Sequence, residues 1–460
     1  MLTRSLGALL VVIFPAILFV TSSAATRAAG TPVTFTKDVA PILYKNCVSC
    51  HRDGEMAPMS LMTYKDARPW AKSIRKNVAE RVMPPWHADP AHGSFSNARR
   101  LSQTEIDTIV AWVDQGAPQG EASDLPPAPT YPDGWDIGVP DAVFEMPEEF
   151  AVPADGVVEY QYFTVQPNFT EDRWIQAAEI RAGNRELVHH VIVFVDEPGG
   201  SPSRAPGIQM IPSARAAESS TSAASTASPT SSTPSTSAAP AASSPSSATP
   251  RRPAARQLGR LLVGQAPGAR PAVFPLGSAK RIKAGSTLTF QMHYTPNGTA
   301  GKDRTRVGLI FAKQPPASEI RTVGVMNTRF VIPAGDGNHQ VLSQAQFTED
   351  AKIWSFFPHM HVRGKSFEYR IVRPDGSSQV LLSVPKYDFS WQGEYVLAEP
   401  VTVPKGTRLE CTAFFDNSRA NLANPDATKD VRWGDQTWEE MMIGWTTFSV
   451  EPTTTTASKL

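Results

Sequence analysis

The sequence predicts a small all-α domain followed by two antiparallel β-sandwich domains of jelly-roll-like form. Helical periodicity is confined to the first quarter of the chain, whereas short alternating runs rich in β-formers, broken by Pro, Gly and Asp, begin beyond Pro126. A length of 460 residues with 41% hydrophobic residues allows about three separate cores. We therefore expect domains at 30–125, 135–315 and 316–452.

Two stretches of the first domain have the signature of helices. In the segment 35–43, Thr36 is placed as an N-cap and Pro41 in the first turn. The second stretch begins with the capping box Ser102-Gln103-Thr104-Glu105 and ends at Gly116. Its predicted buried face consists of Ile106, Ile109, Val110 and Val113.

A haem-attachment motif lies between these helices. Cys47-Val48-Ser49-Cys50-His51 has the CxxCH spacing of covalent c-type haem attachment, with His51 as the proximal iron ligand. Met83, which precedes two prolines in an extended segment, is the preferred distal ligand. The rival distal ligands are Met56, Met59, His87 and His92. Helix, motif, loop and closing helix together predict a cytochrome c-like haem domain at 30–125.

The N-terminus has the pattern of a Sec signal peptide over residues 1–25. Arg4 precedes an apolar run from Leu6 to Val20, which is followed by small residues. The run is shorter than the ~20 residues that cross a bilayer, so no stable membrane insertion is expected. Because haem attachment through thioethers takes place outside the cytoplasm, both signals predict a periplasmic or secreted bacterial protein.

Charge and cysteine content exclude several classes of partner and cross-link. The chain has 44 basic and 44 acidic residues and a formal net charge of zero, which does not favour nucleic acid as a partner. Of three cysteines, two belong to the haem motif. The remaining Cys411 is predicted to be a buried free thiol.

The region beyond residue 135 has the pattern of antiparallel strands. Leu288, Phe290 and Met292 alternate with polar residues, so His293 should lie on the polar face of its strand and point away from the core. Residues 367–372 and 380–384 flank a turn at 373–376 and predict a hairpin. The segment 201–256 is rich in Ser, Ala, Thr and Pro and is predicted to be a disordered insertion.

Five of the nine histidines fall in three groups: His189-His190, His293 and His359-Met360-His361. Imidazoles combined with one soft thioether suit copper, whereas zinc sites recruit thiolates or carboxylates. Residues two apart on a strand share a face, so His359 and His361 can converge on one ion. Adjacent residues face opposite ways, so a shared site requires a bulge or another local irregularity at His189.

The order of the histidine motifs along the chain resembles that in the ascorbate-dependent type II copper monooxygenases, the family that includes peptidylglycine hydroxylase and dopamine β-hydroxylase. The resemblance covers about residues 135–450 and rests on His189-His190, His293-Tyr294, His359-Met360-His361 and Glu439-Glu440-Met441. It implies an electron-transfer copper site at His189, His190 and His293. It also implies a second site, at His359, His361 and Met441, that binds oxygen and the reacting C–H bond; the adjacent Met442 is the alternative to Met441.

The implied function is a secreted copper-dependent monooxygenase that hydroxylates a C–H bond of a small organic substrate with O2. The expected cofactors are two copper ions and one covalently bound haem c, which would deliver electrons from ascorbate or a periplasmic redox protein. Where peptide-amidating relatives hold a substrate carboxylate, this chain has Phe357, Ile443 and Trp445, which implies an apolar pocket. The alternatives are a copper-binding electron-transfer or copper-handling protein without oxygenase activity, and a scaffold that docks a partner.

Overall fold

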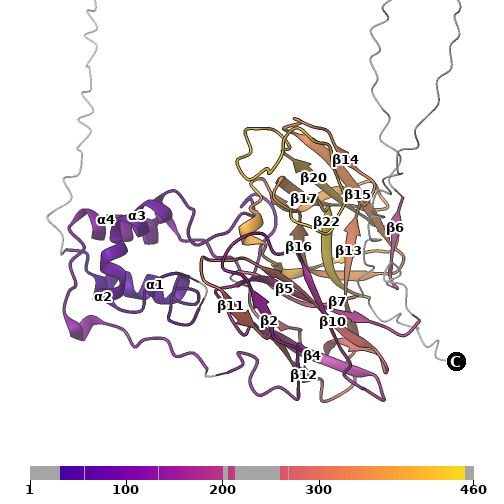
Figure 1. Ribbon diagram of the computed structural model, residues 1–460, viewed down its shortest axis with the longest axis horizontal. Coiled ribbons are helices and arrows are strands. Elements are labelled where there is room, and N and C mark those ends of the chain that lie inside the picture. The colour runs from indigo at the N-terminus through magenta and orange to yellow at the C-terminus, as the bar shows by residue number, and fades with distance from the viewer. Residues whose placement is uncertain are drawn as a thin grey trace, which may run out of the picture.

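A helical region lies beside a large β body in the computed structural model of the chain (Figure 1). The structure describes residues 32–55, 57–132, 134–199, 206–212, 260–267 and 269–450. The predicted signal peptide at 1–25, most of the predicted insertion at 201–256 and the rival haem ligand Met56 lie outside the described residues.

The helical region has a small core of its own, to which Phe35, Leu43, Ile109 and Trp112 contribute fully buried side chains. The capping box at Ser102 is confirmed, since it starts the longest helix. The α-helices are α1 (Ala40–Asn46), α2 (Tyr64–Ala67), α3 (Ala71–Ala79) and α4 (Gln103–Asp114), with π turn η1 (Phe35–Val39) and 3-10 turns η2 (Arg68–Trp70) and η3 (Ala122–Asp124).

The predicted N-cap at Thr36 is wrong. The chain enters η1 two residues earlier, through extended Thr34, whose backbone N–H donates to the Asp38 carboxylate at 2.8 Å. Thr36 is instead buried inside η1, and its hydroxyl donates to the Gln119 carbonyl at 3.1 Å. The helical period alone did not distinguish the two threonines, because both precede the same apolar residues.

The predicted fold class is also wrong. The chain is mostly β, with 38% strand and 13% helix, and no small all-α cytochrome c domain is evident. The helices are 7, 4, 9 and 12 residues long. Turns and irregular segments rich in Ser, Gly and Pro occupy 47–63 and 80–102, where helical periodicity is lost. The expected β-sandwich character is found only in part, because the two predicted sandwiches share one continuous sheet.

One nine-stranded sheet runs through the whole β body in the order β1-β12-β4-β9-β13-β22-β16-β19, with β8 paired to β4. A parallel pairing of β9 with β13 joins its two halves. Its strands are β1 (Ala142–Glu145), β4 (Arg173–Arg181), β8 (Ala272–Val273), β9 (Ser278–Ile282), β12 (Arg306–Phe311), β13 (Ser318–Met326), β16 (Ala351–His359), β19 (Tyr395–Val403) and β22 (Ile443–Val450).

A smaller sheet packs against each half and completes two hydrophobic cores. The first half is covered by β3 (Gln161–Val165), β10 (Thr287–Tyr294), β5 (Val188–Asp196) and β7 (Arg260–Gln265). The second half is covered by β18 (Ser378–Val384), β17 (Gly364–Val372), β20 (Arg408–Phe415), β15 (His339–Phe347) and β6 (Ile208–Ile211). Two-stranded pairs are formed by β2 (Phe150–Val152) with β11 (Gly301–Asp303) and by β14 (Val331–Ile332) with β21 (Val431–Arg432).

Strand β6 corrects the prediction that 201–256 is disordered throughout. It pairs antiparallel with β15 at the edge of the second half, although β5 and β7, which precede and follow it along the described chain, pair with each other in the first half. The chain therefore crosses between the halves and returns. The predicted hairpin is confirmed, since β17 and β18 pair on either side of the turn at 373–376.

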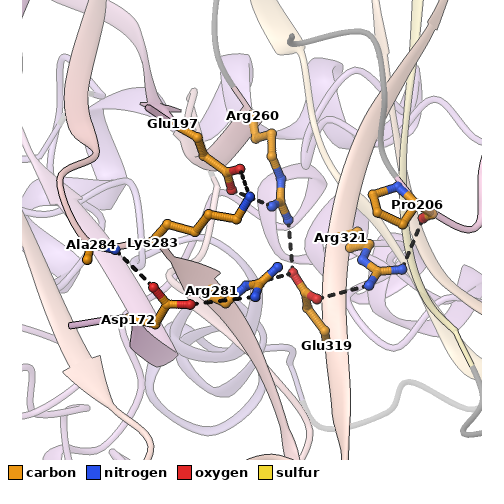
Figure 2. A network of polar contacts seen from close by, with 9 residues as sticks. All are labelled: Asp172, Glu197, Pro206, Arg260, Arg281, Lys283, Ala284, Glu319 and Arg321. Carbon is orange, nitrogen blue, oxygen red and sulfur yellow. Dashed lines mark hydrogen bonds and ion pairs between the residues drawn. The ribbon is translucent and has the colours of Figure 1, made fainter. Parts of the chain in front are cut away.

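Apolar and charged contacts both join the two halves. Ile192, Phe194 and Leu261 of the first half pack with Met441, Ile443 and Trp445 of the second in one buried cluster. Figure 2 shows a network of ion pairs that links the two halves. In it, the Glu319 carboxylate of β13 contacts Arg260 at 3.3 Å, Arg281 at 3.6 Å and Arg321 at 2.9 Å.

Residues 83–99 form an arm that leaves the helical region and lies against the second half. Phe95 forms an antiparallel bridge with Leu397, which adds a short strand to the outer edge of β19. Trp86 and Phe95 stack edge-to-face on Tyr395, with ring centroids 4.9 and 5.7 Å away. No helix among the described residues is long and apolar enough to cross a membrane.

Candidate metal centre

A bulge brings three histidines of the first half together. Strand β10 pairs His293 with His190 and then Tyr294 with Val188, so His189 is skipped in the register. This extra residue turns the His189 side chain toward its neighbour. The irregularity predicted at His189 is thus confirmed, and the metal-binding nitrogens of all three histidines lie within 4.8 Å of one another.

The three Nδ1 atoms converge. His190 Nδ1 is 3.1 Å from His189 Nδ1 and 3.3 Å from His293 Nδ1. On its other side, the His190 ring contacts the Tyr160 hydroxyl through Nε2 at 3.2 Å. The Tyr160 hydroxyl oxygen can accept a hydrogen bond from Nε2–H, and in that tautomer Nδ1 of His190 keeps the lone pair that faces its neighbours.

Burial keeps this triad uncharged. His190 and His293 are 5% and 8% exposed. Desolvation lowers the pKa of His190 well below its usual value and that of His293 to about 3, and repulsion between the rings adds to both shifts. Desolvation also lowers the pKa of His189. Neutral imidazoles are the form that binds metal, so the triad can hold a metal ion at neutral pH.

The second group lies where β16 ends and β22 begins. His359 is the last residue of β16, and His361 lies two residues further along the chain. Met441 lies two residues before the start of β22. Buried Glu440 fixes this turn, because its carboxylate accepts the backbone N–H groups of His361 at 2.8 Å and Arg363 at 2.7 Å. Buried Arg363 in turn donates to the Trp438 carbonyl and the Asn417 side chain.

Hydrogen bonds orient the two rings of this group. His359 Nδ1 lies 2.6 Å from Gln392 Oε1, and His361 Nδ1 lies 3.1 Å from the Glu439 carbonyl. Both contacts require a proton on Nδ1 and leave Nε2 with a lone pair. His361 Nε2 is buried and has no hydrogen-bond partner. Burial lowers the pKa of His359 to about 4 and that of His361 well below its usual value.

The adjacent methionines face opposite ways. Met442 is fully buried in the core of the second half, where its sulfur contacts the Ser343 hydroxyl at 3.2 Å. Met441 lies on the other face, in the apolar cluster between the halves with Ile443 and Trp445. This arrangement favours Met441 over Met442 as the thioether of the second group. Cys411 is a fully buried free thiol, as predicted.

The two groups form one cluster of imidazoles. The His190 and His359 ring centroids are 6.4 Å apart, although the two residues belong to different halves. Tyr160 stacks on His293 at 4.9 Å and on His361 at 6.3 Å, so one aromatic ring contacts both groups. His293 points away from the core of its own half, as predicted, and is buried because the second half covers it.

The loop that carries the CxxCH motif contacts the first half of the β body through one ion pair. His51 Nδ1 is 3.3 Å from the Met59 carbonyl, an arrangement that leaves Nε2 as the available ligand atom. Cys47 and Cys50 are free thiols, and burial raises the pKa of Cys47 to about 12. Glu55, four residues beyond His51, forms an ion pair with Arg185 in the turn that precedes His189. The motif loop therefore contacts the first half in the turn that precedes β5.

The proposed distal ligand Met83 is half-buried at the start of the arm, where its N–H donates to the Asn77 carbonyl at 3.1 Å. In the described part of the helical region, Met59 and Met62 are the methionines that pack against the helical core, together with Cys47. The preference for Met83 as distal ligand stays a prediction.

Three residues that support the histidines did not stand out in the sequence: Tyr160, Gln392 and Glu440. Tyr160 and Gln392 reach the cluster from loops distant along the chain. Glu440 offered a signal, as an acidic residue next to Met441 in a region that becomes buried. A carboxylate buried without an obvious cation points to main-chain N–H partners.

Comparisons with known proteins show no family for this chain. No family model and no curated protein matches it. Among solved structures, the VP2 subviral particle of infectious bursal disease virus has 10% identity over 33% of this chain and 46% of its own, with a TM-score of 0.17. A structure of the Gt strain of the same virus has 8% identity over 71% and 74%, with a TM-score of 0.20. The chain thus spans about half the length of the first of these, and such scores carry no argument about function.

Proposed function

We propose that this protein is a copper-dependent monooxygenase that hydroxylates a C–H bond of a small organic substrate. The observation that carries the proposal is the cluster of five imidazoles, of which four are buried and His189 is half-buried. A triad is formed by Nδ1 atoms, and a pair of rings beside a thioether presents Nε2 atoms. Neutral nitrogens with one soft sulfur form a donor set that suits copper in both oxidation states.

The two groups would have different tasks. His189, His190 and His293 would hold one copper with three similar ligands, which suits a site that only passes electrons. His359, His361 and Met441 would hold the other, where two imidazoles and a weak thioether leave a coordination position open. Copper bound there supplies the one-electron chemistry by which O2 is activated.

The protein residues around the second group would orient ligands and exclude water. Gln392 and the Glu439 carbonyl fix which nitrogen of each ring faces the metal. Glu440 holds the turn between the two histidines. The apolar cluster of Met441, Ile443 and Trp445 lies beside the pair, so a hydrophobic substrate group could be placed there without water.

A haem c attached at Cys47 and Cys50, with His51 as iron ligand, would supply electrons in this proposal. The orientation of the His51 ring, the free thiols and the contact between Glu55 and Arg185 support a haem held between the motif loop and the first half. The pattern of residues 1–25 supports maturation and function in a bacterial periplasm or outside the cell, with ascorbate or a redox protein as the external donor.

A copper-binding electron-transfer or copper-handling protein is the second candidate. The observation that favours it is the short distance of 6.4 Å between the His190 and His359 ring centroids. At this distance, two copper ions could share imidazole ligands. Neither ion would then have a free coordination position for oxygen.

The test begins with the copper and haem content of periplasmically matured protein. We expect two coppers and one haem per chain, with His189→Ala and His359→Ala each losing one copper. Reduced, copper-loaded protein should then reoxidise faster when oxygen and a substrate panel are added than either variant does. Full copper content with equal reoxidation rates would favour the second candidate, and haem without stoichiometric copper would exclude both.

A further inference from the structure

One short turn of the second half contacts both histidine groups. It is the 3-10 turn η4 (Phe389–Trp391), which lies between β18 and β19 along the chain. Gln392, directly after the turn, contacts His359 of the pair. The Phe389 ring contacts the other four imidazoles, which are those of His189, His190, His293 and His361. A single turn therefore contacts the whole cluster.

The Phe389 ring lies close to the axis of the triad. Its centroid is 5.6 Å from that of His189, 5.8 Å from that of His293 and 6.5 Å from that of His190. The three imidazole centroids are between 4.8 and 5.3 Å apart. A ring at similar distances from all three lies over the centre of the triangle that they form. Phe389 therefore covers one side of the triad.

Hydrogen bonds hold the turn in this position. The Gln392 side chain contacts His359 Nδ1 through Oε1 and donates through Nε2 to the Phe389 carbonyl at 3.1 Å. The Asp388 carboxylate accepts the Ser390 N–H at 2.8 Å. Phe389 is half-buried and packs against the core of the second half, whereas Ser390 is exposed. The turn therefore lies at the surface, with the Phe389 ring against the triad.

The number of ligands alone does not decide which group can bind O2. The triad and the pair with Met441 each offer three donor atoms, and a three-ligand site can keep a coordination position for a small molecule. Where three nitrogens converge on an ion, a further ligand can approach along the axis of the triad. Phe389 lies near this axis and is an apolar ring without a donor atom. It therefore occupies space that such a ligand needs.

We infer that Phe389 is a positioning residue that closes the triad to O2 and other small ligands, so that oxygen chemistry is confined to the pair. The assignment of oxygen to the pair rests on the proposed function. The closure of the triad is measured without turnover and, in one experiment, without copper. Failure of the closure and failure of the proposed function are therefore distinguishable.

The first test measures azide binding to the copper-loaded, haem-matured protein through the copper EPR signals. The signals are assigned with His189→Ala and His359→Ala, each of which should retain one copper. We expect azide to change only the signal of the pair in the unmodified protein, and both signals in Phe389→Ala. Ser390→Ala changes an exposed side chain of the same turn and should behave like the unmodified protein.

Two results of this test would overturn the inference. They are an azide effect on the triad of the unmodified protein, and a triad that azide leaves unchanged in Phe389→Ala. If azide changes neither signal in the unmodified protein but changes the triad in Phe389→Ala, the closure is supported and the proposed function is contradicted, because the pair is then closed as well.

The second test uses the copper-free protein. Diethyl pyrocarbonate modifies neutral imidazoles, and both His189 and His92 are half-buried. We expect His189 to react more slowly than His92 in the unmodified protein and several-fold faster in Phe389→Ala, as measured by peptide mass spectrometry. His92 is the internal reference and should keep its rate. Equal rates at His189 in the two proteins would overturn the inference. If Phe389→Ala does not fold, His189 that is as reactive as His92 in the unmodified protein would also overturn it.

Discussion

The two histidine groups reach the same space by different structural means. In the triad, a bulge at His189 and the cross-strand pair His190–His293 aim three Nδ1 atoms at one point. In the pair, His359 ends β16 and His361 follows in a turn held by Glu440, and the Nδ1 atoms of both rings are already occupied. The triad is complete with its own imidazoles, whereas the pair has an unpartnered Nε2 and only a thioether beside it.

The groups also differ in what holds them in place. The triad belongs to two paired strands, so its geometry depends on a β ladder. The pair depends on a turn fixed by Glu440 and by buried Arg363, which is 2% exposed. The copper affinity of the second group should therefore fall more than that of the triad when a single supporting side chain is lost. The following variants test this difference.

Arg363→Met should have the largest effect. It leaves Glu440 buried without its nearby cation and removes hydrogen bonds to Asn417 and the Trp438 carbonyl. Each buried polar group left without its partner costs about 1–3 kcal/mol, so the loss should amount to several kcal/mol. We expect the free energy of unfolding to fall by that amount in denaturant titrations, with loss of copper from the second group and retention in the triad.

A matched control is Arg370→Met on β17. Arg370 pairs with Glu368 at 2.8 Å, with both side chains about one-third exposed, so its loss should cost less than about 1 kcal/mol. Equal destabilisation by the two arginine variants, or equal copper loss from both groups, would show that the turn at Glu440 has no special role.

Acid should destabilise the copper-free protein. The pKa of His359 is lowered by burial to about 4, so below pH 6.5 the unfolded chain binds a proton that the folded chain excludes. The corresponding stability is present above pH 6.5 and is lost as the pH falls toward 4, by up to about 3 kcal/mol for one such group. Urea titrations at pH 7 and 4.5 measure the loss, which should be smaller in His359→Asn. The same pH dependence in both proteins would argue against a neutral buried His359.

Two further variants should act on one group each. Tyr160→Phe keeps the ring but removes the hydroxyl at His190 Nε2, and Gln392→Leu removes the partner of His359 Nδ1. Loss of such supporting hydrogen bonds typically costs 10–100-fold in metal affinity. We expect Tyr160→Phe to weaken copper in the triad and Gln392→Leu to weaken copper in the pair, as measured by chelator competition. Each variant is the control for the other, and a shared effect would mean that the cluster binds copper as a single unit.

Local features of this molecule could be predicted from the sequence, and its long-range pairing could not. The capping box at Ser102 and the hairpin at 373–376 follow from the preferences of neighbouring residues. The irregularity at His189 was expected because adjacent histidines on a strand can share a metal site only if one of them is turned. The parallel contact between β9 and β13 and the crossing of β6 depend on pairings that leave no periodic signal in the sequence. The same holds for Tyr160, whose role is visible only once both halves are packed. The α-helical domain was overpredicted because two good helical stretches were extended across the irregular segments beside them.

The smallest effect is expected at the contact between the motif loop and the first half. Arg185→Gln removes the ion pair with Glu55, both of which are mostly buried side chains. Glu55 keeps a second cation, Arg52 at 2.7 Å, so the loss should cost only about 1 kcal/mol and stability should change little. If electrons reach the triad through this contact, haem-to-copper transfer in stopped-flow experiments should slow by up to about fivefold, the factor that corresponds to 1 kcal/mol. Arg173→Gln, which breaks an exposed pair with Glu171, is the control and should leave the rate unchanged. An unchanged rate in Arg185→Gln would exclude this contact as the electron route.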